Sequence, residues 1–208
     1  MRYRSLVRAT EPAVEPVSVS EAKQHLRVDI SDDDPYIAGL ITTARRYAEE
    51  YLDRSLIHTQ WTMRLDTFPH EFELPRPPMA TSGTMTATSV TYTVDPGGAG
   101  GTSVLTTATL STSTYRVDRE ATPGRIRTVY GGTWPSHLAD PNAVSVTWWG
   151  GYGASGADVP AQIRSAILML VAHLYENRQA AVATGAVPQD VPFGVKALLD
   201  SCKWGSYA

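Results

Sequence analysis

The sequence predicts an α+β fold in which helices form the two ends of the chain and antiparallel strands form the middle. Apolar residues recur with a helical period over residues 36–54 and 159–178, but they alternate with polar residues from Thr59 onward. The order is therefore helices, strands and helices again, which argues against a βαβ sheet. The simplest architecture is a helical domain built from both ends, with an antiparallel β-sandwich or barrel-like domain inserted between them.

Length and composition are those of a globular protein with one domain or two small ones. The chain has 208 residues, of which 42% are hydrophobic and 19% charged, and its formal net charge is −3. This charge argues against broad, non-specific binding to phosphates. A single cysteine, Cys202, rules out an internal disulfide and any multi-cysteine metal site. Because there is no signal peptide or membrane-spanning apolar run, we expect the protein to be made in the cytoplasm and to stay soluble there.

Residues 1–57 are expected to supply an arm and two helices to the helical domain. Residues 1–17 read as an isolated, extended arm because two prolines interrupt any helix. Ser18 and Glu21 have the spacing of a capping box and predict a short helix over about residues 19–27.

The second N-terminal helix is long and amphipathic. Ser31 and Asp34 repeat the start signal, with a proline at the expected first turn, and the apolar stripe continues to about Arg54. The outer side of this helix is expected to carry its charged residues, which are Arg45, Arg46, Glu49, Glu50 and Asp53.

Residues 58–150 have the patterns of antiparallel strands. Trp61, Met63 and Leu65 alternate with polar residues and predict a half-buried strand. The glycine-rich run 95–101 predicts a hairpin tip, since a central strand would not tolerate it. Further strands are expected around Phe72–Leu74 and over residues 89–94, 103–110, 115–118, 125–129 and 143–149.

Residues 151–208 contain the most apolar helix of the chain, expected over about residues 159–178. Its continuous stripe is Ile163, Ala166, Ile167, Leu170, Val171, Leu174 and Tyr175, yet Leu168, Met169 and Ala172 lie off this stripe. A helix that is apolar nearly all round must be covered nearly all round. Either it runs through the centre of its own domain, or another subunit covers its second side. The candidate subunit contacts are Leu168, Met169, Ala172 and His173. A last short helix is expected over residues 195–201.

The run Gly151–Gly156 matches the G-x-G-x-x-G pattern of dinucleotide sites. In such sites the helix begins inside the glycine run, so that its free N–H groups face the pyrophosphate. Here three residues and Pro160 intervene, and no parallel strand follows the helix. We therefore interpret the run as a flexible hinge where the chain leaves the strands, and we predict no bound cofactor.

No residue pattern indicates a metal site or a catalytic site. An acidic cluster precedes the long helix, but it lacks the ligand order of a calcium loop and is better explained by interaction with the helix N-terminus; its members are Asp29, Asp32, Asp33 and Asp34. The histidines fit no zinc spacing; these are His25, His58, His70, His137 and His173. Ser155 is not in a nucleophile elbow. Trp148 and Trp149 must point to opposite faces of a strand, so one is in the core and the other is free to contact a subunit, a sugar or a base.

Taken in order, several fragments resemble the head–tail connector, or adaptor, proteins of tailed phages and gene transfer agents. They are PVSVSEAKQHLRVD (16–29), DDDPYIAGLITTARRYAEEYLDRSL (32–56), TQW (59–61), FELPRPPM (72–79), WP (134–135), VTWWGGYG (146–153), VPAQIRSAILMLVAHLYENRQA (159–180) and VPFGVKALL (191–199). The resemblance covers most of the chain and is weakest over residues 80–114.

This resemblance implies a structural protein of the particle and not an enzyme. Such proteins form a ring, usually of twelve subunits, beneath the portal protein at the head–tail junction. The ring extends the DNA channel, through which DNA passes without sequence-specific binding, and offers a platform to stopper or tail proteins. The C-terminal segment typically docks on the portal, which by position implies residues 191–208 here, with Phe193, Val195, Leu198, Leu199, Trp204 and Tyr207 as candidates.

The residues themselves agree with a ring in two respects. A ring needs two different faces on each subunit, which two long helices can supply. The arm and the aromatic tail can become ordered on partners. The alternative from another functional class is a binding module that recognises carbohydrate or a host surface through exposed tryptophan and tyrosine in the β domain.

Overall fold

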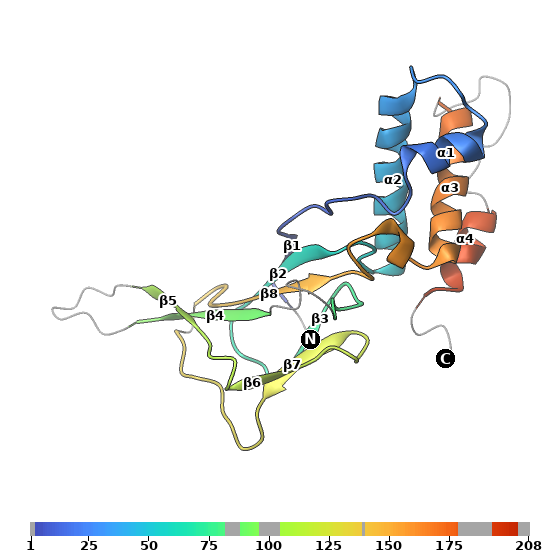
Figure 1. Ribbon diagram of the computed structural model, residues 1–208. Helices are drawn as coiled ribbons and strands as arrows, with labels where there is room; N and C mark the ends of the chain where they lie inside the picture. Colours follow the sequence, from blue (N-terminus) through green and yellow to red (C-terminus); the bar gives the residue numbers. More distant parts are fainter. Residues whose placement is uncertain (1–2, 82–87, 96–104, 139, 179–192, 204–208) are drawn as a thin grey trace, which may run out of the picture. The chain divides into compact units, whose positions relative to one another are not determined.

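The computed structural model describes residues 3–81, 88–95, 105–138, 140–178 and 193–203. The chain divides into two compact units (Figure 1). The β unit contains Met1–Pro12 and His58–Gly151, and the helical unit contains Ala13–Ile57 and Tyr152–Ala208. Each unit is thus assembled from two separate stretches of the sequence.

The β unit is built from antiparallel strands, as predicted. Its five-stranded sheet has the order β1-β2-β8-β4-β5, and its three-stranded sheet has the order β3-β7-β6. Among the described residues these two sheets do not form one closed barrel. The strands are β1 (Ser5–Arg8), β2 (Thr59–Leu65), β3 (Glu71–Leu74), β4 (Ser89–Val94), β5 (Thr106–Thr109), β6 (Tyr115–Asp118), β7 (Gly124–Thr128) and β8 (Val144–Gly150).

The strand register explains how alternating side chains build the core of the β unit. Strand β2 pairs along its whole length with β8, and Trp61 lies opposite Trp148. The inward residues of both sheets form one buried cluster that includes Met63, Phe72 and Ile126. Strands β4 and β5 form the predicted hairpin pair, but residues 96–101 of the predicted tip lie outside the described residues.

The N-terminal arm is not isolated, contrary to the expectation from its prolines. Residues Ser5–Arg8 form β1, which pairs in register with β2. Further along, Val17 is only 1% exposed in the core of the helical unit. The alternation in this short segment is too brief to separate a paired edge strand from a free extended arm, so the pairing could not be read from the sequence.

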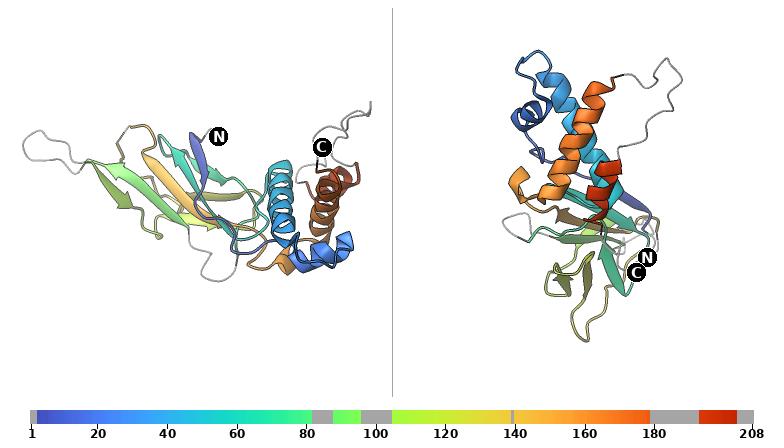
Figure 2. Two further views of the ribbon diagram at one scale, coloured as in Figure 1. Left: turned by 90° about the horizontal axis from the view of Figure 1, so that it is seen from above. Right: turned by 90° about the vertical axis from the view of Figure 1, so that its right-hand side faces the viewer.

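The helical unit contains four described α-helices. These are α1 (Val19–Leu26), α2 (Asp34–Leu52), α3 (Ala161–Glu176) and α4 (Phe193–Asp200), and a 3₁₀ helix at Gly156–Asp158 precedes α3. Helices α2 and α3 pack side by side, while α1 and α4 each contact both of them and do not contact one another in the described residues (Figure 2). None of the described helices is long and apolar enough to cross a membrane.

The predicted helix boundaries hold to within a few residues. The capping box of α1 is present, because the Ser18 hydroxyl accepts from the Glu21 backbone N–H and the Glu21 carboxylate accepts from the Ser18 N–H. Helix α2 begins at Asp34, after Asp33 as its N-cap residue, so Ser31 does not cap it. Helix α3 begins at Ala161, with Pro160 as its N-cap residue, two residues after the expected start at about residue 159.

Candidate functional site

The candidate subunit contacts lie on α3, which, like α2, contacts every other described α-helix of its unit. Its predicted apolar stripe is confirmed in part, since Ile163, Ala166, Ile167, Leu170 and Val171 are buried. The four candidate contacts are half-buried, namely Leu168, Met169, Ala172 and His173. Helix α4 covers part of this second side: a Cβ atom added to Gly194 would lie 2.9 Å from Met169 Cε. The helix therefore runs through its own unit and also keeps partly exposed apolar side chains, and a subunit contact there stays a prediction.

The candidate portal-docking residues fall into two groups on α4. Phe193 is 86% exposed, whereas Val195 and Leu199 are 1% and 0% exposed in the helical core, and Leu198 is half-buried. Trp204 and Tyr207 lie outside the described residues. The end of α4 is also fixed to α2, since the Tyr51 hydroxyl donates to Asp200 Oδ1 at 2.7 Å. In this conformation Val195 and Leu199 hold α4 in place, and Phe193 is the described candidate that a partner can reach.

A buried ionic network in α2 contradicts the expected outer position of its charges. Arg45 is 2% exposed and Glu49 0% exposed, although Arg46 and Glu50 do face solvent as expected. The Arg45 Nη1 donates to Glu49 Oε2 at 3.0 Å, and its Nε donates to Glu15 Oε2 at 2.7 Å.

This network fixes two connecting segments to α2. Glu15 belongs to the chain that leads into α1, and its second oxygen accepts from the Thr42 hydroxyl at 2.9 Å. Glu49 Oε1 accepts from the Leu56 backbone N–H at 3.2 Å, beyond the end of the helix. Sequence reasoning missed the network, yet it left a signal: Arg45 and Glu49 are oppositely charged, four residues apart, and continue the four-residue spacing of the buried Ile37 and Ile41.

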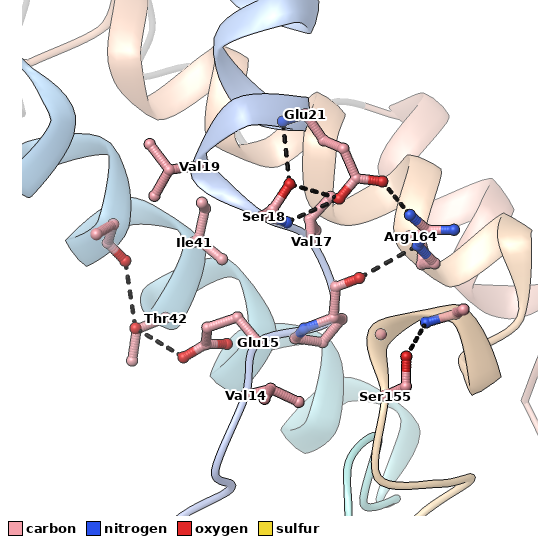
Figure 3. Close-up of a pocket in the computed structure, with 14 residues that line it drawn as sticks. Val14, Glu15, Val17, Ser18, Val19, Glu21, Ile41, Thr42, Ser155 and Arg164 are labelled. Carbon is pink, nitrogen blue, oxygen red and sulfur yellow. Dashed lines mark hydrogen bonds and ion pairs between the residues drawn. The ribbon is translucent and has the colours of Figure 1, made fainter. Parts of the chain in front are cut away.

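A cavity of about 510 Å³ lies where the segment before α1 meets α2 and the start of α3 (Figure 3). The polar side chains that line it already make hydrogen bonds to other protein atoms. Arg164 of α3 donates from Nε to the Pro16 carbonyl at 3.2 Å and contacts the Glu21 carboxylate through Nη2. The cavity wall is thus tied together across 143 residues of sequence, which makes it part of the framework that positions α1 on α3.

Several hydrogen-bonded carboxylates, in the cavity wall and elsewhere in the two units, have lowered pKa values. Hydrogen bonds from Ser18 lower the pKa of Glu21, and the ion pair with Arg164 adds to this. The Tyr175 hydroxyl lowers the pKa of Asp33, and the Asn142 backbone N–H lowers that of Asp66. A carboxylate whose pKa is lowered by folding stabilises the folded state above its ordinary pKa, and this contribution is lost as the pH falls through the folded-state pKa.

We therefore expect the free energy of unfolding to be steady near neutral pH and to fall once the pH drops below about 4. This pH dependence is checked by thermal unfolding, followed by circular dichroism, at pH values from neutral to below 4. The Glu21→Gln variant should show a weaker loss on acidification, because the charge that acid removes is already absent. Glu176→Gln, which changes an exposed carboxylate without a described ion pair, is the matched control and should follow the parent curve; a Glu21→Gln curve with the parent's full acid loss would contradict the expectation.

The acidic cluster before α2 serves helix packing. Asp33 accepts from the Tyr175 hydroxyl and from Arg178 Nη2 at 3.1 Å, so it joins the start of α2 to the end of α3. The Arg178 guanidinium also lies 4.7 Å from the ring centre of Tyr36. Asp34 pairs with Lys23 of α1 at 2.7 Å. Within the described parts of the chain, no group of three or more potential ligands could hold a metal ion.

The glycine run also has a packing role. Helix α3 begins five residues after Gly156, so its free N–H groups are not in the run. Ser155 instead caps the 3₁₀ helix, and its hydroxyl accepts from the Ala157 N–H at 3.2 Å. A Cβ atom at Gly156 would lie 2.6 Å from the Pro16 carbonyl oxygen, so the backbones approach each other where a side chain would not fit. The boundary between the two units falls after Gly151.

The adjacent tryptophans point to opposite faces of β8, as predicted. Trp148 is fully buried, and Trp149 is half-buried. In the described residues, aromatic rings cluster elsewhere in the β unit, where Phe68 stacks on Trp134 with ring centres 5.1 Å apart.

Both a protein family and solved structures resemble this chain. The model of the phage gp6-like head-tail connector protein family matches residues 16–78. This stretch includes the buried Arg45–Glu49 pair and the cap of α1, and the match confirms the resemblance inferred from the same residues. No match was found among curated proteins.

Solved structures with the same fold come from gene transfer agent (GTA) particles. A chain from the neck of an empty GTA particle computed with C6 symmetry is 24% identical with a TM-score of 0.70, covering 96% of this chain and 95% of that one. A chain from the virion of a native GTA particle is 23% identical with a TM-score of 0.70, covering 95% and 94%. A chain from the neck of a native GTA particle computed with C12 symmetry is 22% identical with a TM-score of 0.64, covering 96% and 94%. The similarity spans both units.

Proposed function

We propose that this chain is a structural head–tail connector, or adaptor, of a phage or phage-like particle. The observation that carries the proposal is the combination of two matches: residues 16–78 fit the connector family, and the fold as a whole fits chains from GTA necks. The role is non-enzymatic. The protein would act at the head–tail junction, where it extends the DNA channel and gives the stopper or tail a platform for attachment.

In this proposal the working form is a ring beneath the portal protein. The related neck structures were computed with C6 and C12 symmetry, which supports a ring and is compatible with twelve copies. The helical unit would form the ring, with Leu168, Met169, Ala172 and His173 of α3 meeting the neighbouring copy. The β unit, whose two sheets share one core in a sandwich-like manner, would be peripheral or face the tail side.

The C-terminal segment would dock on the portal. Phe193, Leu198, Trp204 and Tyr207 would supply apolar contacts, and Phe193 is exposed enough to do so without rearrangement. Val195 and Leu199 would contribute by keeping α4 on the helical core. The proposed alternative, recognition of carbohydrate by the β unit, has no support in the comparisons.

Truncation of the C-terminus tests both the connector role and the docking assignment. Removing residues 204–208 keeps Val195 and Leu199, so we expect the free energy of unfolding to be unchanged while affinity for purified portal falls at least about tenfold. Removing residues 193–208 deletes two buried side chains and should also cost about 2–5 kcal/mol of stability. Binding is measured by negative-stain electron microscopy and sedimentation with portal from the same particle.

A variant in which residues 204–208 are replaced by glycine and serine controls for chain length. Undiminished portal binding by the shorter truncation would show that docking uses another surface. Failure of the full-length chain to bind portal or to form rings on it would contradict the connector role itself.

A further inference from the structure

Helices α2 and α3 each have an outward side that the core of the helical unit does not use. The two helices pack side by side (Figure 2), and their buried residues belong to one core. The exposed residues along the outward side of α2, here called the glycine stripe, are Pro35, Gly39, Thr43, Arg46 and Glu50. The exposed or half-buried residues along the outward side of α3, here called the leucine stripe, are Ala161, Ser165, Leu168, Ala172 and Glu176. Since each helix turns its buried side toward the other, the two stripes point in opposite directions.

The first half of the glycine stripe presents very little side chain. Gly39 lies inside α2, where glycine is destabilising relative to alanine. A Cβ atom at Gly39 would meet no described atom within 4 Å, so packing within the described helical unit does not require a glycine there. One turn later the Thr43 hydroxyl donates to the Gly39 carbonyl at 2.9 Å, which satisfies this hydroxyl within the helix. A second helix can therefore approach this half of α2 closely, because the distance between packed helices depends on the side chains at their contact.

Helices α2 and α3 run antiparallel, so the start of one lies beside the end of the other. Near the start of α2, the ring of Tyr36 lies 6.1 Å from the ring of Tyr175, which is near the end of α3. Just beyond the opposite end of α2, Arg54 Nη1 donates to the hydroxyl of Tyr152, which precedes α3, at 3.0 Å. Each residue advances a helix by about 1.5 Å. Equal numbers of residues counted from the tyrosine pair, forward in α2 and backward in α3, therefore reach the same level.

This count brings the least bulky part of one stripe level with the apolar part of the other. Gly39 and Ala172 lie equally far from the tyrosine pair, and so do Thr43 and Leu168. The glycine is thus level with an alanine, and the threonine is level with a leucine. Leu168 and Ala172 are the same half-buried residues that the proposed ring places against a neighbouring copy.

We propose that the glycine stripe of each copy receives the leucine stripe of the next copy in the ring. This inference rests on the proposed connector function and names the second surface of its subunit contact. A ring repeats one heterologous contact, so each copy needs two different surfaces that face the neighbours on its two sides. In a ring whose axis runs along α2 and α3, neighbours differ by a rotation that keeps every residue at its level. Gly39 then meets Ala172 of the next copy, and Thr43 meets Leu168.

The charged half of the glycine stripe does not obstruct this contact. By the same count Arg46 is level with Ser165, and Glu50 is level with Ala161. These short side chains leave the two long, charged ones a path to water, as arginine and glutamate need when an apolar surface covers their stems. The contact therefore buries small and apolar groups without burying a charge.

Enlarging Gly39 should affect folding and assembly in opposite ways. Gly39→Ala should raise the melting temperature of the isolated chain by about 1–3 °C, because alanine is the better helix former. Gly39→Leu has room in the isolated chain and should keep the parent melting temperature to within a few degrees, yet form at least about tenfold fewer rings on purified portal. Melting is followed by circular dichroism, and rings are counted by electron microscopy.

Ser20→Leu is the matched control for added bulk, since Ser20 is an exposed residue of α1 outside both stripes. Its melting temperature and ring yield should stay close to those of the parent chain. Ring formation by Gly39→Leu at the parent level would overturn the proposal, and so would an equal loss of rings in Ser20→Leu.

A disulfide cross-link tests the pairing of the two stripes directly. The variant carries Gly39→Cys and Ala172→Cys in a chain whose own cysteine is removed by Cys202→Ser, and it is oxidised with oxidised glutathione while bound to portal. A disulfide needs Cα atoms within about 7 Å, so it reports a close approach. We expect a ladder of linked oligomers longer than dimers on a non-reducing gel, and no ladder from either single-cysteine chain, because only a head-to-tail contact joins one stripe to the other.

The remaining outcomes separate this inference from the connector role. Linked dimers from Gly39→Cys alone would indicate a two-fold contact between glycine stripes and overturn the proposal. Rings of the double-cysteine chain that stay unlinked after oxidation would overturn it too, while leaving the connector role intact. A parent chain that forms no ring on portal would overturn the connector role, and this inference with it.

Discussion

Replacing Arg45 by alanine is expected to destabilise the helical unit by about 3–5 kcal/mol. The reason is the environment of its partner: Glu49 is 0% exposed, and the arginine supplies its buried ion pair at 3.0 Å. Without Arg45 the buried Glu49 carboxylate loses the guanidinium group that pairs with it. Glu15 also loses its 2.7 Å partner, so the segment before α1 loses one of its attachments to α2.

Urea unfolding of the Arg45→Ala chain, followed by circular dichroism at neutral pH, measures this loss. Arg46→Ala is the matched control, because Arg46 is the next residue of the same helix but faces solvent; its effect should stay below about 1 kcal/mol. Restoring size without charge gives a second control: combining Arg45→Met with Glu49→Leu removes the buried charges together and should recover much of the stability. Equal effects of the Arg45 and Arg46 substitutions would refute the role given to the buried network.

Leu170→Asp is expected to prevent stable folding of the helical unit, while Leu168→Asp should leave the unit folded and weaken ring assembly. Leu170 is 4% exposed in the core, so an aspartate there is a buried, unpaired charge that costs several kcal/mol. Leu168 is only half-buried and can turn an introduced carboxylate toward water. In the proposed ring the same carboxylate would lie in an apolar subunit contact.

The two variants separate stability from assembly when each is followed by circular dichroism and by electron microscopy with purified portal. Leu170→Asp should lose helical signal and rings together. Leu168→Asp should keep the parent's helical signal and melting temperature to within a few degrees, but form few rings. Normal rings from Leu168→Asp would exclude that part of α3 from the subunit contact.

Local patterns predicted much of the fold because the relevant interactions lie close together in the sequence. The capping box of Ser18 and Glu21 located α1, and the alternation of Trp61, Met63 and Leu65 located β2. Two features that depend on distant partners were missed. Ser5–Arg8 became a strand only because β2 offers a free edge, and Arg45 became buried only because Glu15 approaches from outside the helix.

The functional prediction rests on similarity to known proteins and not on local sequence patterns. Ordered fragments of sequence pointed to the connector proteins, and the family match over residues 16–78 and the shared fold agree with that. The candidate surfaces were predicted less well. Periodicity identifies which side of α3 is apolar, but it cannot show that α4 covers part of that side, or that Val195 and Leu199 of α4 are buried in the helical core.

The interleaving of the two units along the chain has a consequence for biosynthesis. The β unit needs β1 from the first dozen residues and β8 from near residue 150, and the helical unit needs α2 together with α3 and α4. Neither unit can close while its later stretch is still within the ribosome. Folding of each unit therefore waits until its later stretch has left the ribosome, and the earlier stretch must be kept from aggregating until then.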